Sequence, residues 1–326
     1  YSVVASYFQN EKIRTVMSFH PLLIGGNPFS VTSAYALINA LERDGGVHSA
    51  MGGTGAIVRA MVRLLAERGV PVRCNAPVVK IRVEGRRAIG VELANGEFMA
   101  ADIVVSNADS AWTYKHLIAP RHRRVWTDRK IDRGRYSMGL FVWYFGTARQ
   151  YPEVPHHMML LGPRYKELLT DIFKRHKLAE DFSLYLHRPT ATDPSLAPPG
   201  CDTFYALAPV PHLDSGTDWA LQAEPYRQAI AALLEATVLP GLRGQIVSSK
   251  VTTPQDFHDR LWSFKGAGFG LEPLLLQSAW FRPHNRSEDV DGLYMVGAAT
   301  HPGAGVPGVL MSAKALETVV PHVHAR

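Results

Sequence analysis

Residues Gly303-Ala304-Gly305-Val306-Pro307-Gly308 constrain this chain more than any other stretch, because successive small residues let another group approach the backbone closely. They follow a predicted strand at residues 293–296 and precede a predicted helix that begins at about Gly308. Their spacing matches the G-x-G-x-x-G pattern of a nucleotide-phosphate loop. That loop needs a complete βαβ unit with an acidic residue about 20 positions later. Only 18 residues (326 − 308) follow Gly308, without a second strand, so we reject this assignment.

Close approach of a flat ligand to the start of a helix explains the same residues. The unpaired N–H groups of a first helical turn and the positive end of the helix dipole stabilise negative charge on a bound group, such as a reduced flavin ring. Pro307 suits the first turn, where no N–H donor is needed. A tight structural turn between a strand and its closing helix is the alternative, and the loop alone leaves both open.

Composition narrows the class of protein. With 326 residues and 46% hydrophobic content, the chain can bury a large core and is long enough for two domains. Its net charge of +6 favours anionic partners such as phosphate groups or acidic lipid surfaces. No zinc-finger spacing or RNA-binding signature accompanies that charge, so we expect no nucleic acid partner. Cys74 and Cys201 fit neither a metal site nor a disulfide framework, which predicts a reducing compartment.

We expect neither a membrane span nor a leader in this sequence. Its longest apolar runs, such as residues 138–145, are shorter than the roughly 20 residues of a membrane-crossing helix. Any membrane contact is therefore expected to be peripheral. The chain begins Tyr1-Ser2-Val3-Val4 without a charged-then-apolar pattern, so we expect a fragment and no signal peptide in it.

Periodicity and turn residues predict the elements. Helices are expected at residues 5–17, 32–42 and 56–68, with turns at 25–28 and 52–55. Strands are expected at 72–74, 78–84, 88–93 and 97–100 as a small antiparallel ribbon, and then at 101–109, 139–146, 182–187 and 203–210. The aromatic run Phe141–Phe145 either lines a ligand tunnel or forms sheet core.

Residues 291–309 resemble the C-terminal flavin signature of bacterial phytoene desaturases, which are carotenoid desaturases of the flavin amine-oxidase-like superfamily. Further segments resemble that family in the same order, so the similarity covers essentially the whole chain. These segments are residues 23–29, 52–55, 105–109, 161–165, 180–185, 208–212 and 277–285.

The resemblance implies an α/β (α+β) fold, with an incomplete Rossmann-like FAD domain and a substrate domain of mixed or antiparallel sheet and helices. It also implies that the N-terminal dinucleotide-binding motif of the family precedes this sequence. We expect residues 1–50 to be the helical part of the substrate or membrane region and residues 51–110 to be a segment of the FAD-binding domain. Residues 111–285 are then the substrate-binding domain, and residues 286–326 are the C-terminal FAD-binding segment.

FAD is the cofactor that the resemblance implies. The expected contacts to its ring side are Gly297, Ala298, Gly303, Gly305, Val306, Pro307, Gly308 and Val309. In the wider fold the strand after the Gly-Gly helix contacts the adenine through its backbone, which points to Val78 here. No metal site is expected.

The implied activity is FAD-dependent desaturation of phytoene, an acyclic C40 carotenoid, towards lycopene or a related polyene, with this fragment alone expected to be inactive. Carotenoid isomerisation or ketolation on the same scaffold, and non-catalytic binding of a prenyl lipid, are the alternatives. The sequence identifies no firm catalytic residue. His301 beside the glycine-rich loop is an acid/base candidate, and an imidazole bonded to the loop backbone is the other interpretation.

A carotenoid substrate implies contact with a membrane surface, with a quinone or oxygen as electron acceptor and a cytoplasmic location at the bacterial inner membrane. Tyr165, Leu168, Leu169 and Ile172 form one face of a predicted helix that ends in a basic run at residues 174–177. This pattern is typical of an interfacial segment. A stripe buried in the domain core, with solvated charges, is the alternative.

Overall fold

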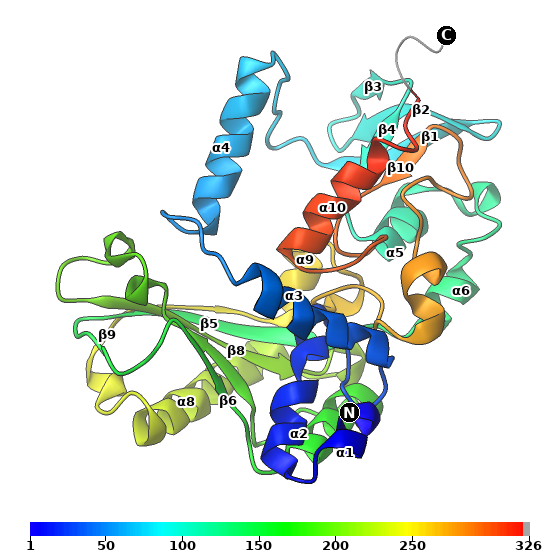
Figure 1. The fold of residues 1–326 in the computed structure, drawn as a ribbon. Helices are drawn as coiled ribbons and strands as arrows, with labels where there is room; N and C mark the ends of the chain where they lie inside the picture. The colour runs from blue at the N-terminus through cyan, green and yellow to red at the C-terminus, as the bar shows by residue number, and fades with distance from the viewer. Residues whose placement is uncertain (322–326) are drawn as a thin grey trace. The chain divides into compact units, whose positions relative to one another are not determined.

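The computed structural model describes residues 1–321, which form two compact units (Figure 1). Unit 1 contains residues 1–44, 75–138 and the part of the chain from Phe257 onward. Unit 2 contains residues 45–74 and 139–256. The units therefore divide at positions other than the expected 50, 110 and 285. The functions assigned to the four expected ranges stay predictions.

The ten α-helices of the described chain are mostly short. They are α1 (Ser2–Tyr7), α2 (Glu11–Ser18), α3 (Leu37–Gly45), α4 (Thr54–Glu67), α5 (Ser110–Trp112), α6 (Asp128–Arg133), α7 (Tyr165–Thr170), α8 (Trp219–Thr237), α9 (Pro254–Leu261) and α10 (Val306–Leu316). The helix expected at 5–17 is divided in two. The first half ends at Tyr7, and Asn10 starts the second, because its side chain accepts hydrogen bonds from the N–H groups of Lys12 (2.9 Å) and Ile13 (3.3 Å) and so caps α2.

Unit 2 is built on an antiparallel sheet in the order β6-β7-β8-β5-β9. Its strands are β5 (Gly139–Thr147), β6 (His157–Leu160), β7 (Leu184–His187), β8 (Asp202–Val210) and β9 (Ile246–Thr252). Successive side chains of a strand point to opposite faces. Phe141, Trp143 and Phe145 are accordingly buried in the core that includes α8, whereas Tyr144 is 44% exposed. The aromatic run is therefore sheet core, and the tunnel interpretation does not hold for these three rings.

The apolar stripe of α7 and of the helical turn after it, residues 171–175, is also part of a core. Tyr165, Leu168, Leu169 and Ile172 are all buried, with Leu169 fully enclosed. The interfacial interpretation of this helix is wrong, because its apolar face is not available to a lipid surface. No helix within residues 1–321 combines the length and the apolar character needed to cross a membrane.

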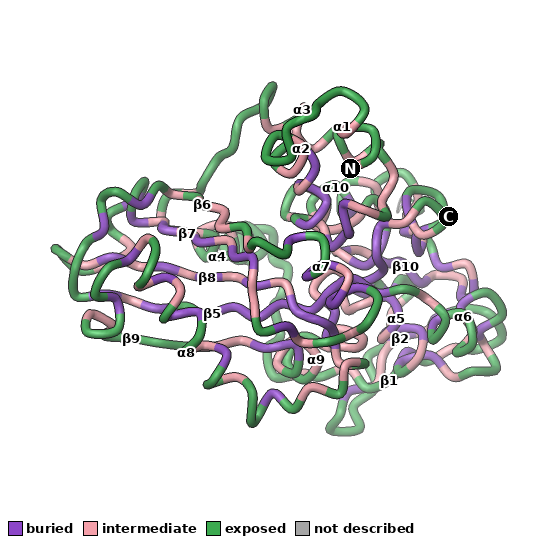
Figure 2. Tube along the Cα trace, turned by 90° about the horizontal axis from the view of Figure 1, so that it is seen from below, coloured by how far each residue is buried: buried purple, intermediate pink, exposed green. Residues whose placement is uncertain are grey.

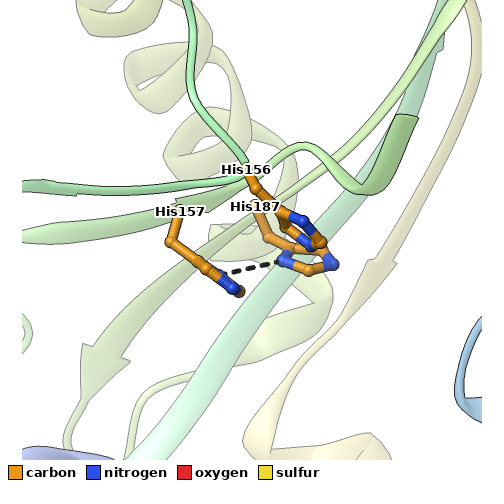
Figure 3. Close-up of side chains that lie close together, drawn as sticks. All are labelled: His156, His157 and His187. Atoms are coloured by element: carbon orange, nitrogen blue, oxygen red, sulfur yellow. Dashed lines mark hydrogen bonds between the residues drawn. The ribbon is translucent and has the colours of Figure 1, made fainter. Parts of the chain in front are cut away.

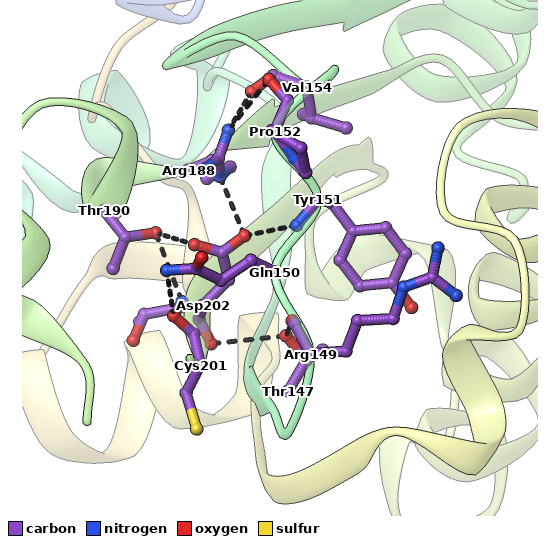
Figure 4. A network of polar contacts seen from close by, with 11 residues as sticks. Thr147, Arg149, Gln150, Tyr151, Pro152, Val154, Arg188, Thr190, Cys201 and Asp202 are labelled. Carbon is purple, nitrogen blue, oxygen red and sulfur yellow. Dashed lines mark hydrogen bonds and ion pairs between the residues drawn. The ribbon is translucent and has the colours of Figure 1, made fainter. Parts of the chain in front are cut away.

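A buried polar network fixes the start of β8 (Figure 4). The Asp202 carboxylate is 1% exposed and accepts hydrogen bonds from Arg188 Nε (2.9 Å), Thr190 Oγ1 (2.6 Å) and the Tyr151 N–H (2.7 Å). Arg188 Nη1 donates in turn to the Val154 carbonyl at 2.6 Å. Both buried charges are thus paired and hydrogen-bonded, which is the condition for tolerating them in an interior.

Unit 1 contains two small sheets. Strands β1 (Val78–Glu84), β2 (Arg87–Leu93) and β3 (Phe98–Ala100) form the expected antiparallel ribbon, whereas residues 72–74 are not a strand. Strands β4 (Val104–Ser106) and β10 (Leu293–Met295) pair in parallel, and all three residues of β10 are buried. Figure 2 shows the same continuous burial along β10 in unit 1 and along most of β5 in unit 2.

Candidate functional site

The carboxyl ends of β4 and β10 meet at one edge of the parallel pair. Met295 is paired with Ser106, and the Val296 N–H donates to the Ser106 carbonyl at 2.9 Å. The chain continues from β4 into residues 107–109 and from β10 into the glycine-rich segment 297–308. Ligands of open α/β sheets bind outside the carboxyl ends of such strands, so this edge is the candidate site.

Two glycines make the segment after β10 possible. Gly297 has φ +102°, and a Cβ placed there would lie 2.5 Å from Asn107 Oδ1. Gly308 lies in the first turn of α10, where a Cβ would lie 2.7 Å from the Gly303 carbonyl oxygen. A Cβ at Gly297 would displace the Asn107 side chain and would need a φ that other residues rarely adopt, and a Cβ at Gly308 would push against backbone. The loop therefore folds this tightly only with glycine at these positions.

The side chain of Arg282 fixes the loop through hydrogen bonds to backbone carbonyls. Its buried guanidinium donates to four backbone carbonyls, those of Thr300 (3.1 Å), Leu271 (3.2 Å), Phe269 (3.1 Å) and Ala298 (2.7 Å). The planar guanidinium has five N–H donors in a fixed arrangement, and here it joins two separate stretches of backbone. The loop conformation therefore depends on a side chain outside the loop.

Asn285 makes a second connection of the same kind. Its Nδ2 donates to the carbonyls of Met295 (3.2 Å), His301 (3.0 Å) and Ser312 (3.3 Å), which join β10, the loop and α10. The fully buried Ser312 adds a link, because its Oγ accepts from the Gly297 N–H at 2.8 Å. The ends of the loop are thus fixed by side-chain contacts to backbone.

Asp109 places an acidic group at the same edge. Its Oδ1 accepts from the N–H groups of Ala111 (2.8 Å) and Trp112 (3.1 Å), although the side chain keeps partial solvent access. Burial raises the pKa of Asp109 to about 6, because desolvation outweighs these hydrogen bonds and the charge of Arg282. A carboxyl group that changes protonation near neutral pH therefore lies beside the candidate site.

A cavity of about 580 Å³ lies against the glycine-rich loop, within the range of about 300–1,000 Å³ of small-molecule sites. One wall is formed by the loop, including Gly303 and Gly308. The opposite walls come from α3 with the residues before it, and from residues 273–282. Large apolar side chains at this cavity are unusually exposed: Leu37 (60%), Leu41 (61%), Leu275 (67%), Trp280 (75%) and Phe281 (53%).

The structure brings part of the predicted set to this cavity. Gly303, Gly308 and His301 line it. The imidazole of His301 is exposed and makes no hydrogen bond to the loop backbone within residues 1–321. Gly297 and Ala298 lie at the end of β10, and Gly305, Val306, Pro307 and Val309 lie where the loop joins α10. Val78 begins β1 in the same unit and is not among the residues that line this cavity.

Sequence reasoning missed Arg282, Asn285 and the role of Asp109. Arg282 and Asn285 stand in a segment that resembles the family, and Asp109 follows an apolar strand, but neither feature indicates what these side chains contact. The only sequence signal was a charged residue within the apolar stretch Trp280-Phe281-Arg282-Pro283.

Comparison with known proteins gives consistent matches. Residues 2–315 match the profile of the family described as flavin containing amine oxidoreductase. The chain is 51% identical over 319 residues to a phytoene desaturase (neurosporene-forming) of Rhodobacter capsulatus, covering 96% of this chain and 61% of that protein. It is 49% identical over 323 residues to a phytoene desaturase (lycopene-forming) of Pseudescherichia vulneris, covering 98% of this chain and 65% of that protein. The chain thus spans less than two thirds of these relatives.

Solved structures confirm the expected α/β fold class. An oxidoreductase from Methanosarcina mazei superposes with a TM-score of 0.68 at 18% identity, covering 97% of this chain and 67% of that one. A redesigned putrescine oxidase superposes with a TM-score of 0.64 at 13% identity, covering 98% and 66%. At these identities the likeness establishes the fold alone.

Proposed function

This chain belongs to the flavin containing amine oxidoreductase family, whose cofactor is FAD, and we propose that it is part of an enzyme that desaturates phytoene. The observation that carries the proposal is identity of 49–51% to phytoene desaturases over nearly the whole chain. The relatives include neurosporene-forming and lycopene-forming enzymes at almost equal identity. Product analysis therefore has to determine the number of desaturation steps.

The residues around the loop fit a flavin. Gly303, Ala304 and Gly308 place small residues on one wall of an apolar cavity, where a flat ring can approach the backbone. We assign the ring side of the cofactor to the predicted residues Gly297, Ala298, Gly303, Gly305, Val306, Pro307, Gly308 and Val309, and the adenine to the backbone of Val78. When bound, the flavin supplies the acceptor for two hydrogens that leave a C–C bond as a hydride and a proton.

The protein's own contribution is position and electrostatics. The apolar walls of the cavity orient a hydrocarbon and exclude water from it. The N-terminal N–H groups of α10 and the buried charge of Arg282 stabilise negative charge beside the loop. Asp109, at the end of β4, can hold or release a proton near pH 6 because burial raises its pKa, and His301, which lines the cavity, stays the predicted acid/base candidate.

A hydrocarbon substrate has to be taken from a lipid phase, so we place peripheral membrane contact at the exposed apolar residues around the cavity. The cytoplasmic face of the inner membrane would supply both the carotenoid and a quinone as electron acceptor, with oxygen as the alternative. Trp280→Ser with Phe281→Ser is expected to reduce co-sedimentation with phosphatidylglycerol vesicles. Val247→Ser, which alters a 66% exposed apolar residue of unit 2, serves as the matched control. Equal sedimentation of both variants and the parent protein would move the membrane contact elsewhere.

The decisive experiment joins this chain to the N-terminal segment of the Rhodobacter capsulatus relative and expresses the chimera in a bacterium that accumulates phytoene. We expect coloured polyenes in the extract and a flavin absorption spectrum in the purified protein. Bound flavin with unchanged phytoene would instead indicate another reaction on this scaffold. Folded protein without flavin or product would overturn the assignment of the cofactor site.

A further inference from the structure

Three histidines gather at the edge of the unit 2 sheet (Figure 3), far along the chain from the loop described above. His157 begins β6 and His187 ends β7, and the antiparallel register places them directly opposite each other. His156 precedes β6, and its carbonyl accepts from the Arg188 N–H at 2.9 Å, which holds this residue beside the same pair. One ring nitrogen from each histidine lies within 4.8 Å of those from the other two.

From this arrangement we propose that His156, His157 and His187 form a binding site for a divalent transition-metal ion of the Zn²⁺ class. Imidazole nitrogen is a preferred ligand of such ions. The Nδ1 atoms of His157 and His187 are 3.4 Å apart. Two nitrogens at about 2.05 Å from a tetrahedral zinc ion are separated by about 3.4 Å, so this pair already has the spacing of two ligands.

His156 can supply the third ligand. Nδ1 of His156 contacts Thr192 Oγ1 at 2.5 Å, which fixes the ring, while its Nε2 is buried and has no hydrogen-bond partner within residues 1–321. An outer hydrogen bond on one ring nitrogen that leaves the other available is the usual arrangement of a metal-binding histidine. A buried polar atom without a partner is otherwise unfavourable, and an ion would satisfy it.

The surroundings favour coordination and allow entry. The hydroxyl of Tyr185 lies 2.5 Å from His157 Nδ1 and 3.1 Å from His187 Nδ1, so an oxygen donor adjoins both. His157 is exposed, so an ion reaches the cluster from solvent. A bound ion would clamp the four-residue edge strand β6 to β7.

The test uses the complete chain without a polyhistidine tag, freed of metal with a chelator. We expect calorimetric titration with Zn²⁺ to show one ion per chain, and Co²⁺ to develop a visible absorption band that Zn²⁺ abolishes. His156→Ala and His187→Ala should each weaken Zn²⁺ binding by at least about tenfold. His48→Ala alters an exposed histidine of the same unit and should leave the affinity unchanged.

Absence of saturable binding above the level of the His156→Ala variant would overturn the proposal, as would unchanged affinity in both cluster variants. If His187→Ala does not fold, His156→Gln provides the same comparison at the end of the cluster outside the strands. Because the cluster lies in unit 2, this result is independent of whether the chain binds FAD.

Discussion

Replacement of Arg282 by methionine should loosen the glycine-rich loop, because the guanidinium joins the backbone of residues 298–300 to that of residues 269–271. Methionine keeps an unbranched side chain of similar length and removes the charge and every N–H donor. Four carbonyls, those of Phe269, Leu271, Ala298 and Thr300, lose this donor at once. The substitution therefore tests the claim that the loop is held from outside.

The size of the effect follows from two opposing contributions. Hydrogen bonds to a charged group contribute about 1.5–3 kcal/mol each, so four give a gross loss of about 6–12 kcal/mol. Removing a buried cation recovers several kcal/mol of desolvation free energy. The difference is about 4 kcal/mol, comparable to the cost of about 3–5 kcal/mol for breaking a buried charged pair.

Hydrogen exchange measured by mass spectrometry reports the loss of stability for the loop itself. A local measurement is needed because a chain of two units need not unfold in one step. A loss of 4 kcal/mol corresponds to about a thousandfold faster exchange of protected amides in residues 296–303. Peptides of β5 and β8 should be unaffected, and Arg43→Met should have no effect because that side chain is 79% exposed. A change of less than about tenfold in the loop, equivalent to about 1.4 kcal/mol, would refute the reasoning.

Three further outcomes are expected. Asp202→Asn should lower the unfolding free energy of unit 2 by about 3 kcal/mol in urea titration, because it leaves the buried Arg188 charge unpaired. Asp109→Asn should gain stability relative to the parent protein as pH rises from 4 to 7. The folded pKa of Asp109, about 6, exceeds its unfolded value of 3.8, so the parent loses up to about 3 kcal/mol across that window, reduced by partial solvent access. Gly308→Ala should lower FAD occupancy of the chimera, because the new Cβ would lie 2.7 Å from the Gly303 carbonyl oxygen. Overpacking of this kind costs about 1–3 kcal/mol. The occupancy is measured as the ratio of flavin absorbance at about 450 nm to protein absorbance.

Each of these changes has a control of the same chemistry. Glu153→Gln alters an exposed carboxylate of unit 2, Asp102→Asn an exposed carboxylate of unit 1, and Gly45→Ala a glycine with open space around its Cβ position. Equal effects of Asp202→Asn and Glu153→Gln would show that the buried network does not stabilise unit 2. A pH dependence of Asp109→Asn that matches Asp102→Asn would remove Asp109 as the group responsible. Full flavin occupancy in Gly308→Ala would show that the loop tolerates a side chain.

Local patterns predicted local elements well. Residues 78–84 were expected as a strand with the bounds that β1 has, because turn residues Gly85 and Asn95-Gly96 delimit the ribbon. Strand β9 was missed, since Ser248, Ser249 and Lys250 at its centre interrupt the apolar pattern on an exposed edge strand. Helix α8 was missed as well, and it carries Pro225 in its interior.

The candidate site also has a part that local sequence predicts and a part that it does not. The glycine-rich segment was found from its composition, because close backbone approach demands particular residues at consecutive positions. Arg282 and the histidine cluster depend on contacts between residues that are distant in the chain. The partners of Arg282 are backbone carbonyls, which every residue has, so no residue type marks them in the sequence. His187 lies beside His157 only because of the register between β6 and β7. No local pattern encodes either arrangement.

The interleaving of the two units has a consequence for biosynthesis. Unit 2 is complete once residue 256 has left the ribosome, but unit 1 still lacks Arg282, Asn285, β10 and α10. Residues 139–316 number 178 (316 − 138), which take about 10 to 35 s to synthesise at about 5–20 residues per second. During that interval the nascent apolar residues around β4, among them Val104 and Leu117, lack their later partners. Chaperone binding to the emerging chain is therefore expected to concentrate on residues 75–138.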